Sequence, residues 1–181
     1  MKTAEVLSQT KWGIDPTHSE VQFKVKHLVI ATVTGAFKKF SGDVTSESED
    51  FHNAIVNFAI DVNSIDTNQT DRDTHLKSED FFAAAQHPEI TFSGVLNKQK
   101  GNEYKLAGDL TIRGTAKAVE LDVEFGGSAK DPWGNIKAGF ELTGKLNRKD
   151  FGLTWSALTE AGGMVVGDDV KLHMNIELVK K

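Results

Sequence analysis

The densest group of side chains that could do chemistry is the segment Asp71-Arg72-Asp73-Thr74-His75. Two carboxylates and an imidazole are ligands that a divalent metal accepts, so a rim metal-dependent hydrolase using Asp71, Asp73 and His75 is one candidate function. Arg72 lies between them, and a guanidinium is a poor neighbour for a cation. Two alternatives are a simple ion pair with a turn capped by Asp73, and a polar rim where Arg72 and His75 touch the head group of a ligand.

Other segments with catalytic resemblance lack the residues that make such motifs specific. Gly162–Gly167 has no following Lys-Ser/Thr pair, so a flexible hairpin is favoured over a phosphate loop. Asp150-Phe151-Gly152 matches a kinase tripeptide, but the other kinase motifs are missing. His18 and His27 are predicted to be structural histidines. The sequence therefore predicts no catalytic residue and no metal site.

Composition excludes several classes of protein. The 181 residues contain no cysteine, which excludes a disulfide framework and a thiolate metal or redox site. The net charge of -5 argues against a nucleic-acid-binding surface. The first ten residues lack the apolar core of a signal peptide, and no segment approaches the roughly 18 apolar residues of a membrane-spanning helix. We therefore expect a cytoplasmic protein with no stable membrane insertion.

The elements that must position these side chains are strands. Val119–Phe125 and Lys171–Leu178 alternate apolar and polar residues, which is typical of antiparallel strands with one buried face. Phe37 and Phe40 are three residues apart and cannot both face inward on a regular strand, so a bulge or bend is expected there. Eight strands are predicted, over residues 20–27, 35–45, 54–62, 89–97, 104–113, 117–127, 135–147 and 170–179.

The chain leaves the strand pattern between the third and fourth predicted strands. A short helix is expected across Gln69–Lys77, capped by Asp66 or Thr67. A second is expected over Glu79–Gln86, stopping before Pro88. The predicted fold is a single all-β domain over residues 1–181, with residues 1–11 as an N-terminal extension. It is a lipocalin-like eight-stranded antiparallel barrel with a short helical excursion, and a two-sheet sandwich is the alternative.

The apolar face of these strands carries no carboxylate, lysine, arginine or serine, so enzymatic groups would have to lie at the rim and we expect no enzyme. Gly94, Gly108, Ala138 and Gly144 are small residues on that face. They predict unfilled volume that a lipid tail would occupy. The alternative is that the glycines lie at barrel corners, where tight coiling requires them.

Several separated motifs occur in a fixed order along the chain, and together they resemble the YceI-like family of bacterial polyisoprenoid-binding proteins. The resemblance covers about Trp12 to Leu178. It implies a lipocalin-like barrel that holds a long isoprenoid chain, such as a polyprenyl pyrophosphate or a ubiquinone-like molecule. The motifs are Asp15-Pro16-Thr17-His18-Ser19, Gly35-Ala36-Phe37-Lys38-Lys39-Phe40-Ser41-Gly42, Arg72-Asp73-Thr74-His75-Leu76, His87-Pro88-Glu89-Ile90-Thr91-Phe92, Gly108-Asp109-Leu110-Thr111-Ile112-Arg113-Gly114 and Arg148-Lys149-Asp150-Phe151-Gly152.

We therefore expect a protein that sequesters or carries a long apolar lipid, with roles in transport or stress response. No cofactor is expected besides the bound lipid, and an exposed edge or face could support a homodimer. A ligand-free interaction or stress module is the further alternative. The predicted tail-binding residues are Phe23, Val25, Phe37, Phe58, Ile60, Phe92, Leu110, Ile112, Val123, Phe140, Leu142 and Met174, and the predicted mouth residues are Arg72, His75, Phe81, Phe82 and Trp155.

Overall fold

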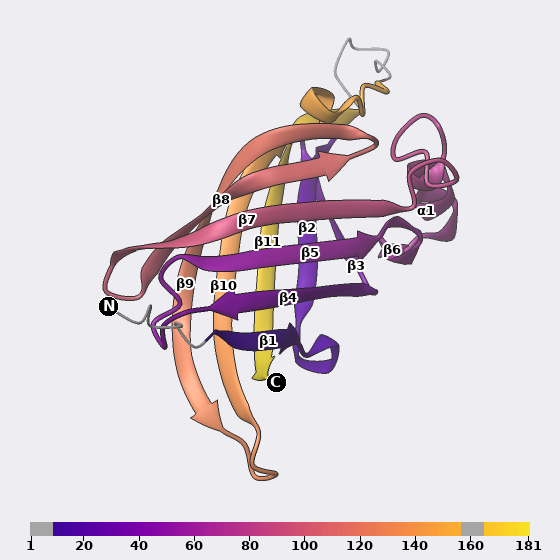
Figure 1. The fold of residues 1–181 in the computed structure, drawn as a ribbon. Helices are drawn as coiled ribbons and strands as arrows, with labels where there is room; N and C mark the ends of the chain where they lie inside the picture. Colours follow the sequence, from indigo (N-terminus) through magenta and orange to yellow (C-terminus); the bar gives the residue numbers. More distant parts are fainter. Residues whose placement is uncertain (1–8, 157–164) are drawn as a thin grey trace, which may run out of the picture.

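The structure is a computed structural model that describes residues 9–156 and 165–181, and strands make up most of it (Figure 1). The helical segments are α1 (Thr70–Lys77) and three 3-10 turns, η1 (Pro16–His18), η2 (Val62–Ser64) and η3 (Arg148–Phe151). The described part of the chain has no helix with the length and apolarity needed to cross a membrane. The strands are β1 (Thr10–Ile14), β2 (Glu20–His27), β3 (Ala31–Phe37), β4 (Phe40–Ser46), β5 (Ala54–Asp61), β6 (Ile65–Asp66), β7 (Glu89–Lys100), β8 (Glu103–Ile112), β9 (Thr115–Lys130), β10 (Ile136–Asn147) and β11 (Val166–Lys180).

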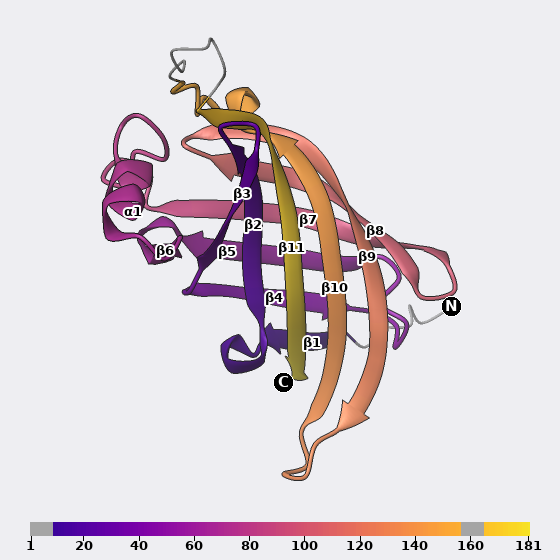
Figure 2. The same cartoon turned by 180° about the vertical axis from the view of Figure 1, so that it is seen from behind.

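Eight of these strands form a closed antiparallel barrel. The order is β1-β4-β5-β7-β8-β9-β10-β11, and pairing of β1 with β11 closes the ring. The long hairpins from β7 to β11 build the curved wall seen in Figures 1 and 2. The predicted lipocalin-like barrel is confirmed. Strand β1 includes Thr10 and Lys11, which the sequence analysis assigned to the N-terminal extension.

One edge of β11 is shared between two partners. Val166 to Asn175 pair with β2, whereas Leu178 to Lys180 pair with β1. The turn η1 separates β1 from β2, and its flanks are fastened to Glu177. The Asp15 N–H donates to the Glu177 carbonyl at 2.8 Å, and the Glu177 N–H donates to the Ser19 hydroxyl at 2.9 Å.

Two further breaks separate consecutive strands, one between β3 and β4 and one between β5 and β6. Lys38 and Lys39 separate β3 from β4, and η2 separates β5 from β6. This is the predicted bend, and it places both Phe37 and Phe40 against the core. Strands β2, β3 and β6 continue the sheet from β11 outside the closed ring, so the ring closes through β1 only at the C-terminal end of β11, which lies at the bottom of Figure 1. The chain from β6 to β7 crosses the open side through α1.

The helical excursion is partly as predicted. Helix α1 is present, but its N-cap is Gln69, whose side chain accepts from the Arg72 N–H at 3.2 Å, and neither Asp66 nor Thr67. The prediction of a second helix over residues 79–86 is wrong. This segment forms successive turns around Ala83, which has φ of 48°. Burying Phe81, Ala83 and Ala84 together requires an irregular backbone, because helical spacing would turn one of them outward.

The end of the barrel opposite α1 is closed by aromatic rings. Phe51, from the loop between β4 and β5, is 1% exposed. Its ring centroid lies 5.1 Å from those of Trp12 and Phe140 and 5.4 Å from that of Phe125. The Tyr104 hydroxyl donates to the Asp50 carbonyl and ties the loop to the wall. We call these packed rings the aromatic plug.

The carboxylate of Asp15 stabilises η1. It accepts from the Thr17 N–H at 3.0 Å and from the Lys137 ammonium at 2.7 Å, and it lies 2.9 Å from Nδ1 of His18. The hydrogen bonds from Lys137, Thr17 and His18 hold the pKa of Asp15 far below its usual range. Asp15 in turn raises the pKa of His18.

Asp15→Asn should lower the free energy of unfolding by about 2 kcal/mol, because charge-assisted hydrogen bonds are lost. Folding lowers the pKa of Asp15, so its ionised carboxylate stabilises the fold above the ordinary pKa of 3.8. Folding raises the pKa of His18, so its protonated imidazole stabilises the fold below the ordinary pKa of 6.5. The deficit should therefore be largest between these values, and it should shrink as the pH falls through the lowered pKa of Asp15. Urea denaturation across this range measures it. Asp122→Asn, in an exposed pair with Lys105, is the control and should cost less than about 1 kcal/mol; an equal loss in both variants would contradict the prediction.

Candidate functional site

An apolar cavity of about 220 Å³ runs through the barrel interior. All twelve predicted tail-binding residues line it, from Phe23 on β2 to Met174 on β11. Along β11 the lining includes Val166 and the alternate residues from Val170 to Leu178, and the latter segment is about 26 Å long at the usual rise per residue. The cavity is thus long and narrow, and the aromatic plug lies beyond its inner end. Its other lining side chains include Ile14, Val21, Val44, Val56, Ile90, Leu96, Leu106, Val119, Leu121, Leu146, Phe151 and Leu153.

The inward glycines do not create this volume, which corrects the sequence interpretation. The Phe92 ring lies over Gly94 and Gly108, and a Cβ built on either glycine would come within 2.9 Å of the ring. The Leu121 side chain covers Gly144 in the same way. Each of these glycines leaves room for a large side chain that packs against the barrel wall. The cavity is the space left between the bulky side chains.

A second cavity of about 340 Å³ adjoins the first and forms the mouth. The two share the lining residues Phe23, Val25, Leu76, Phe81 and Val166, so these side chains lie between the tunnel and the mouth. Four of the predicted mouth residues, Arg72, His75, Phe81 and Trp155, line it, whereas Phe82 lies farther inside. Lys26, His27, Thr67, Gln69 and Asp71 complete its polar edge.

Three rings pack at the inner edge of the mouth. The His75 ring centroid lies 4.8 Å from that of Trp155 and 5.1 Å from that of Phe81, both edge to face. Phe81 and Trp155 are 5.3 Å apart. The His75 Nε2 atom lies 2.9 Å from a carboxylate oxygen of Asp80, which fixes the orientation of the imidazole. The three rings therefore form one packed cluster at the mouth, with Phe81 also lining the tunnel.

Arg72 presents unused donors to the mouth. Its Nε donates to the Thr67 hydroxyl at 2.7 Å and its Nη2 to the Thr67 carbonyl at 2.6 Å. None of the hydrogen bonds within the described residues uses its Nη1. A guanidinium held this way is preorganised for an anionic or carbonyl group of a ligand.

The geometry contradicts the hypothesis that Asp71, Asp73 and His75 together hold a metal. One carboxylate oxygen of Asp73 accepts from both the N–H and the hydroxyl of Thr67, and His75 is held by Asp80. These side chains do not converge on a common point. The His/Asp/Glu group that does converge within the described residues is Asp15, His18 and Glu177.

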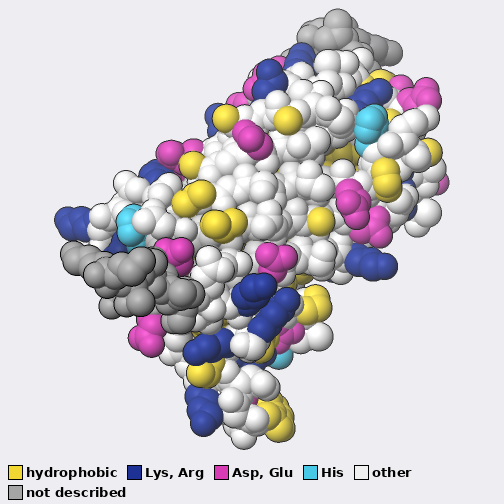
Figure 3. Space-filling view, viewed as in Figure 1, with side chains coloured by type: hydrophobic (Ala, Val, Ile, Leu, Met, Phe, Trp, Pro, Cys, Tyr) yellow, Lys and Arg dark blue, Asp and Glu magenta, His cyan; other side chains and the backbone are white. Residues whose placement is uncertain are grey.

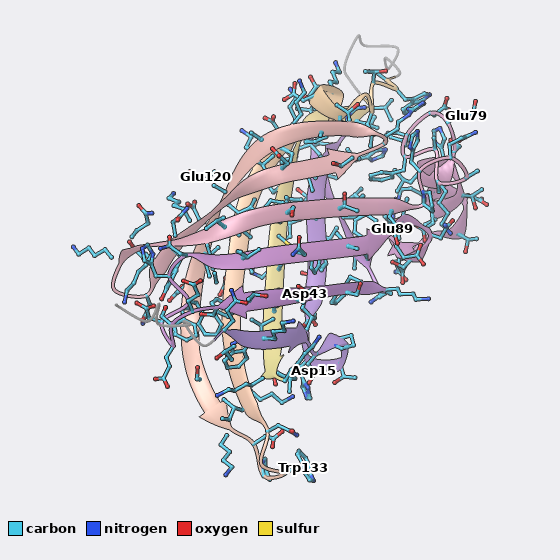
Figure 4. All side chains as sticks on the ribbon, in the orientation of Figure 1. Asp15, Asp43, Glu79, Glu89, Glu120 and Trp133 are labelled. Atoms are coloured by element: carbon cyan, nitrogen blue, oxygen red, sulfur yellow. The ribbon has the colours of Figure 1, made fainter. Side chains whose placement is uncertain are left out.

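That second group already contains a cation. The Lys137 ammonium lies 2.7 Å from the Asp15 carboxylate and 3.4 Å from that of Glu177. These carboxylates raise the pKa of Lys137, with the hydrogen bond to Asp15 as the main cause. The cluster is an ion-pair network that links η1 to β10 and β11. Asp15 is labelled in Figure 4. His18 thus has the structural role expected for it, whereas His27, predicted to be structural as well, is exposed and lines the mouth.

Arg148 lies in one of the family motifs but is not among the site residues that the sequence predicts. Its side chain is buried, and the guanidinium donates to the carbonyls of Leu153, Trp155 and Gly167 at 2.7–2.8 Å. Burial lowers the pKa of Arg148, and the charge of Asp168 opposes that shift. Arg148 therefore fixes Trp155 and the start of β11 at one side of the mouth. The sequence signal for this role is the position of Arg148 at the end of a predicted strand, just before the motif Lys149-Asp150-Phe151-Gly152.

A family model for the YceI-like domain matches residues 12–178. The chain belongs to the YceI-like family. Relatives of this YceI-like protein include a UPF0312 protein of Staphylococcus epidermidis, 37% identical over 93% of this chain and 96% of the relative. The protein YceI of Salmonella newport is 35% identical over 97% of this chain and 89% of its own length.

Solved structures share the fold. A YceI protein of Campylobacter jejuni is 34% identical and superimposes with a TM-score of 0.70 over 86% of this chain and 90% of its own. Burkholderia cenocepacia BcnA has 24% identity and a TM-score of 0.78, covering 91% of this chain and 98% of its own. The second likeness is one of fold alone.

Arg148→Met should destabilise this YceI-like protein by about 3 kcal/mol, because buried carbonyls lose a charged donor. The neighbouring change Lys149→Met removes an exposed ion pair to Asp168 and should cost less than about 1 kcal/mol. Urea denaturation of both variants measures the difference. Equal stability of the two variants would show that the guanidinium hydrogen bonds contribute nothing to the free energy of unfolding.

Proposed function

We propose that this protein binds one long-chain amphiphile, with its tail in the tunnel and its head at the mouth. The observation that carries the proposal is the shape and polarity of the cavity: narrow, apolar, closed at one end by the aromatic plug and open to charged groups at the other. Burial of each tail methylene contributes about 0.8 kcal/mol, so the tail supplies most of the affinity. The head contacts set the direction in which the ligand enters.

The finer part of the proposal concerns the class of ligand. We infer an isoprenoid tail from the family resemblance, and an anionic or quinone head because Arg72, Lys26 and His27 offer cationic and hydrogen-bonding groups where the head would emerge. A fold relative of 16% identity and TM-score 0.65, covering 94% of this chain and 98% of its own, is described as a polyisoprenoid-binding domain from Saccharophagus degradans. That likeness contributes the fold only; the argument for the head group depends on the mouth of this chain.

Native mass spectrometry of the protein purified from its expression host tests the central claim. A bound amphiphile appears as added mass that is lost on denaturation, and extraction then identifies it. If no mass is added, delipidated protein should bind a polyprenyl pyrophosphate or a ubiquinone more tightly than a straight-chain fatty acid of equal length. A protein that takes up none of these has no tail-binding function.

Met174→Trp should block the tunnel, because the larger ring occupies cavity space beside Met174 on β11. Its control is Asn175→Trp, the same new side chain on the next residue, which is exposed and faces outward. We expect the first variant to lose tail binding at least about tenfold and the second to bind as the parent does. Thermal denaturation confirms that both are folded. Equal binding by both variants would place the tail elsewhere.

Arg72→Gln should weaken the binding of a polyprenyl pyrophosphate by about tenfold or more, which is the usual contribution of a hydrogen bond to a charged group. Binding of the matching polyprenol, which lacks the charged head, should be nearly unchanged. A loss of fold would weaken both ligands equally. Lys117→Gln removes the same charge from an exposed site on β9 and should change neither. Equal losses for both ligands in Arg72→Gln would remove Arg72 from head-group recognition.

A further inference from the structure

The tip of the β2–β3 hairpin exposes three consecutive aliphatic side chains. Leu28 is 38% exposed, Val29 is 68% exposed and Ile30 is 85% exposed. Single exposed apolar residues are ordinary on protein surfaces, and the face in Figure 3 shows hydrophobic side chains scattered among charged ones. A run of three at a projecting turn is different, because all of its side chains can enter one apolar phase together.

The backbone of this turn is unfavourable for the residues it carries. Leu28 and Val29 have φ of 54° and 67°, and the Ile30 N–H donates to the His27 carbonyl at 3.3 Å. His27 pairs with Ala31, so the loop has three residues, and positive φ at the two central residues of its turn is the pattern of a type I′ turn, in which Asn and Gly are preferred. A β-branched valine is rare in this region of φ. Stability alone would not select Leu-Val here, so the aliphatic side chains indicate a role outside the fold.

The tip lies directly beside the mouth. Lys26 and His27, which immediately precede it, and Val33, which follows it, line the mouth cavity. The Leu28 N–H donates to the Val165 carbonyl at 3.0 Å, next to Val166 in the same lining. Figure 2 shows the β2–β3 hairpin turning at the upper end of the molecule, the end that carries α1 and η3. Whatever covers the tip also faces the entrance of the tunnel.

Charge indicates the nature of that surface. Lys24 and Lys26 are exposed on β2 just before the tip, and His27 is exposed beside them. A short aliphatic tip flanked by lysines matches an anionic lipid bilayer, in which apolar side chains enter the acyl boundary and ammonium groups meet phosphates. Lys130 on β9 and Lys180 on β11 are also exposed, so charge alone does not select this end of the molecule; the position of the aliphatic tip beside the mouth does.

We propose that Leu28, Val29 and Ile30 dock the mouth of the barrel onto an anionic membrane surface, from which the amphiphile enters or leaves. This inference depends on the proposed function for its purpose but stands on the hairpin tip for its evidence. Contact is interfacial and reversible, since three side chains reach only the outer acyl region.

The test replaces the tip with the turn that the backbone prefers. Leu28→Asn, Val29→Gly and Ile30→Thr together should raise the melting temperature, because the turn strain is relieved, and should weaken binding to phosphatidylcholine vesicles containing phosphatidylglycerol by about tenfold or more. Cosedimentation measures the binding. A structural role for the tip would lower stability instead, so the two effects have opposite signs. Lys24→Gln with Lys26→Gln should weaken binding to the anionic vesicles only.

Trp133 supplies the matched control. It is 84% exposed at the tip of the β9–β10 hairpin, at the opposite end from the α1 region (Figure 4). Trp133→Asn should leave vesicle binding unchanged. Unchanged binding by the triple variant, loss of binding in Trp133→Asn, or concentration-dependent dimerisation that the triple variant abolishes would each overturn the proposal.

Solution binding separates this proposal from the proposed function. The triple variant should still take up a detergent-solubilised polyprenyl pyrophosphate with the parent affinity. A parent protein that binds vesicles but no amphiphile would refute the tunnel function and leave the docking surface standing. A triple variant that loses amphiphile in solution would show that the tip belongs to the tunnel and would refute docking.

Discussion

The division of one edge of β11 between two partner strands determines the shape of the whole molecule. Where β1 pairs with β11, the ring closes; where β2 takes over, the pairing continues into β3 and β6 and never returns to β7. A backbone edge can bond only one neighbour at each level, so β1 and β2 occupy different parts of β11, and the opening arises because pairing on the β2 side ends at the two-residue strand β6. The network of Asp15, Lys137 and Glu177 stabilises the point of transition.

The polarity of the interior follows from this arrangement. Inside the closed half, large side chains face one another, and aromatic rings fill the bottom. In the open half, the edges of the sheet are covered by α1, by the turns after it and by the segment held by Arg148, and these bring polar groups with them. Apolar and charged linings are thus separated along one axis. An amphiphile matches this separation end for end.

Much of this could be predicted from residues alone, because strand alternation depends only on local sequence. The long hairpins, the bend between Phe37 and Phe40 and the membership of the tunnel lining all follow from that alternation. The turns over residues 79–86 could not, since their helical pattern was overridden by the burial of Phe81, Ala83 and Ala84. The role of the glycines also depended on where the Phe92 ring would lie, which is a tertiary fact. Arg148 depended on carbonyls that distant segments bring to it.

The aromatic plug has a kinetic consequence. A tunnel with a single opening admits no second guest while the first is inside, so replacement of one bound lipid by another must pass through the empty protein. Exchange would then proceed at a rate set by departure alone and independent of how much competitor is present. A two-ended channel, in contrast, would let an arriving chain push its predecessor out.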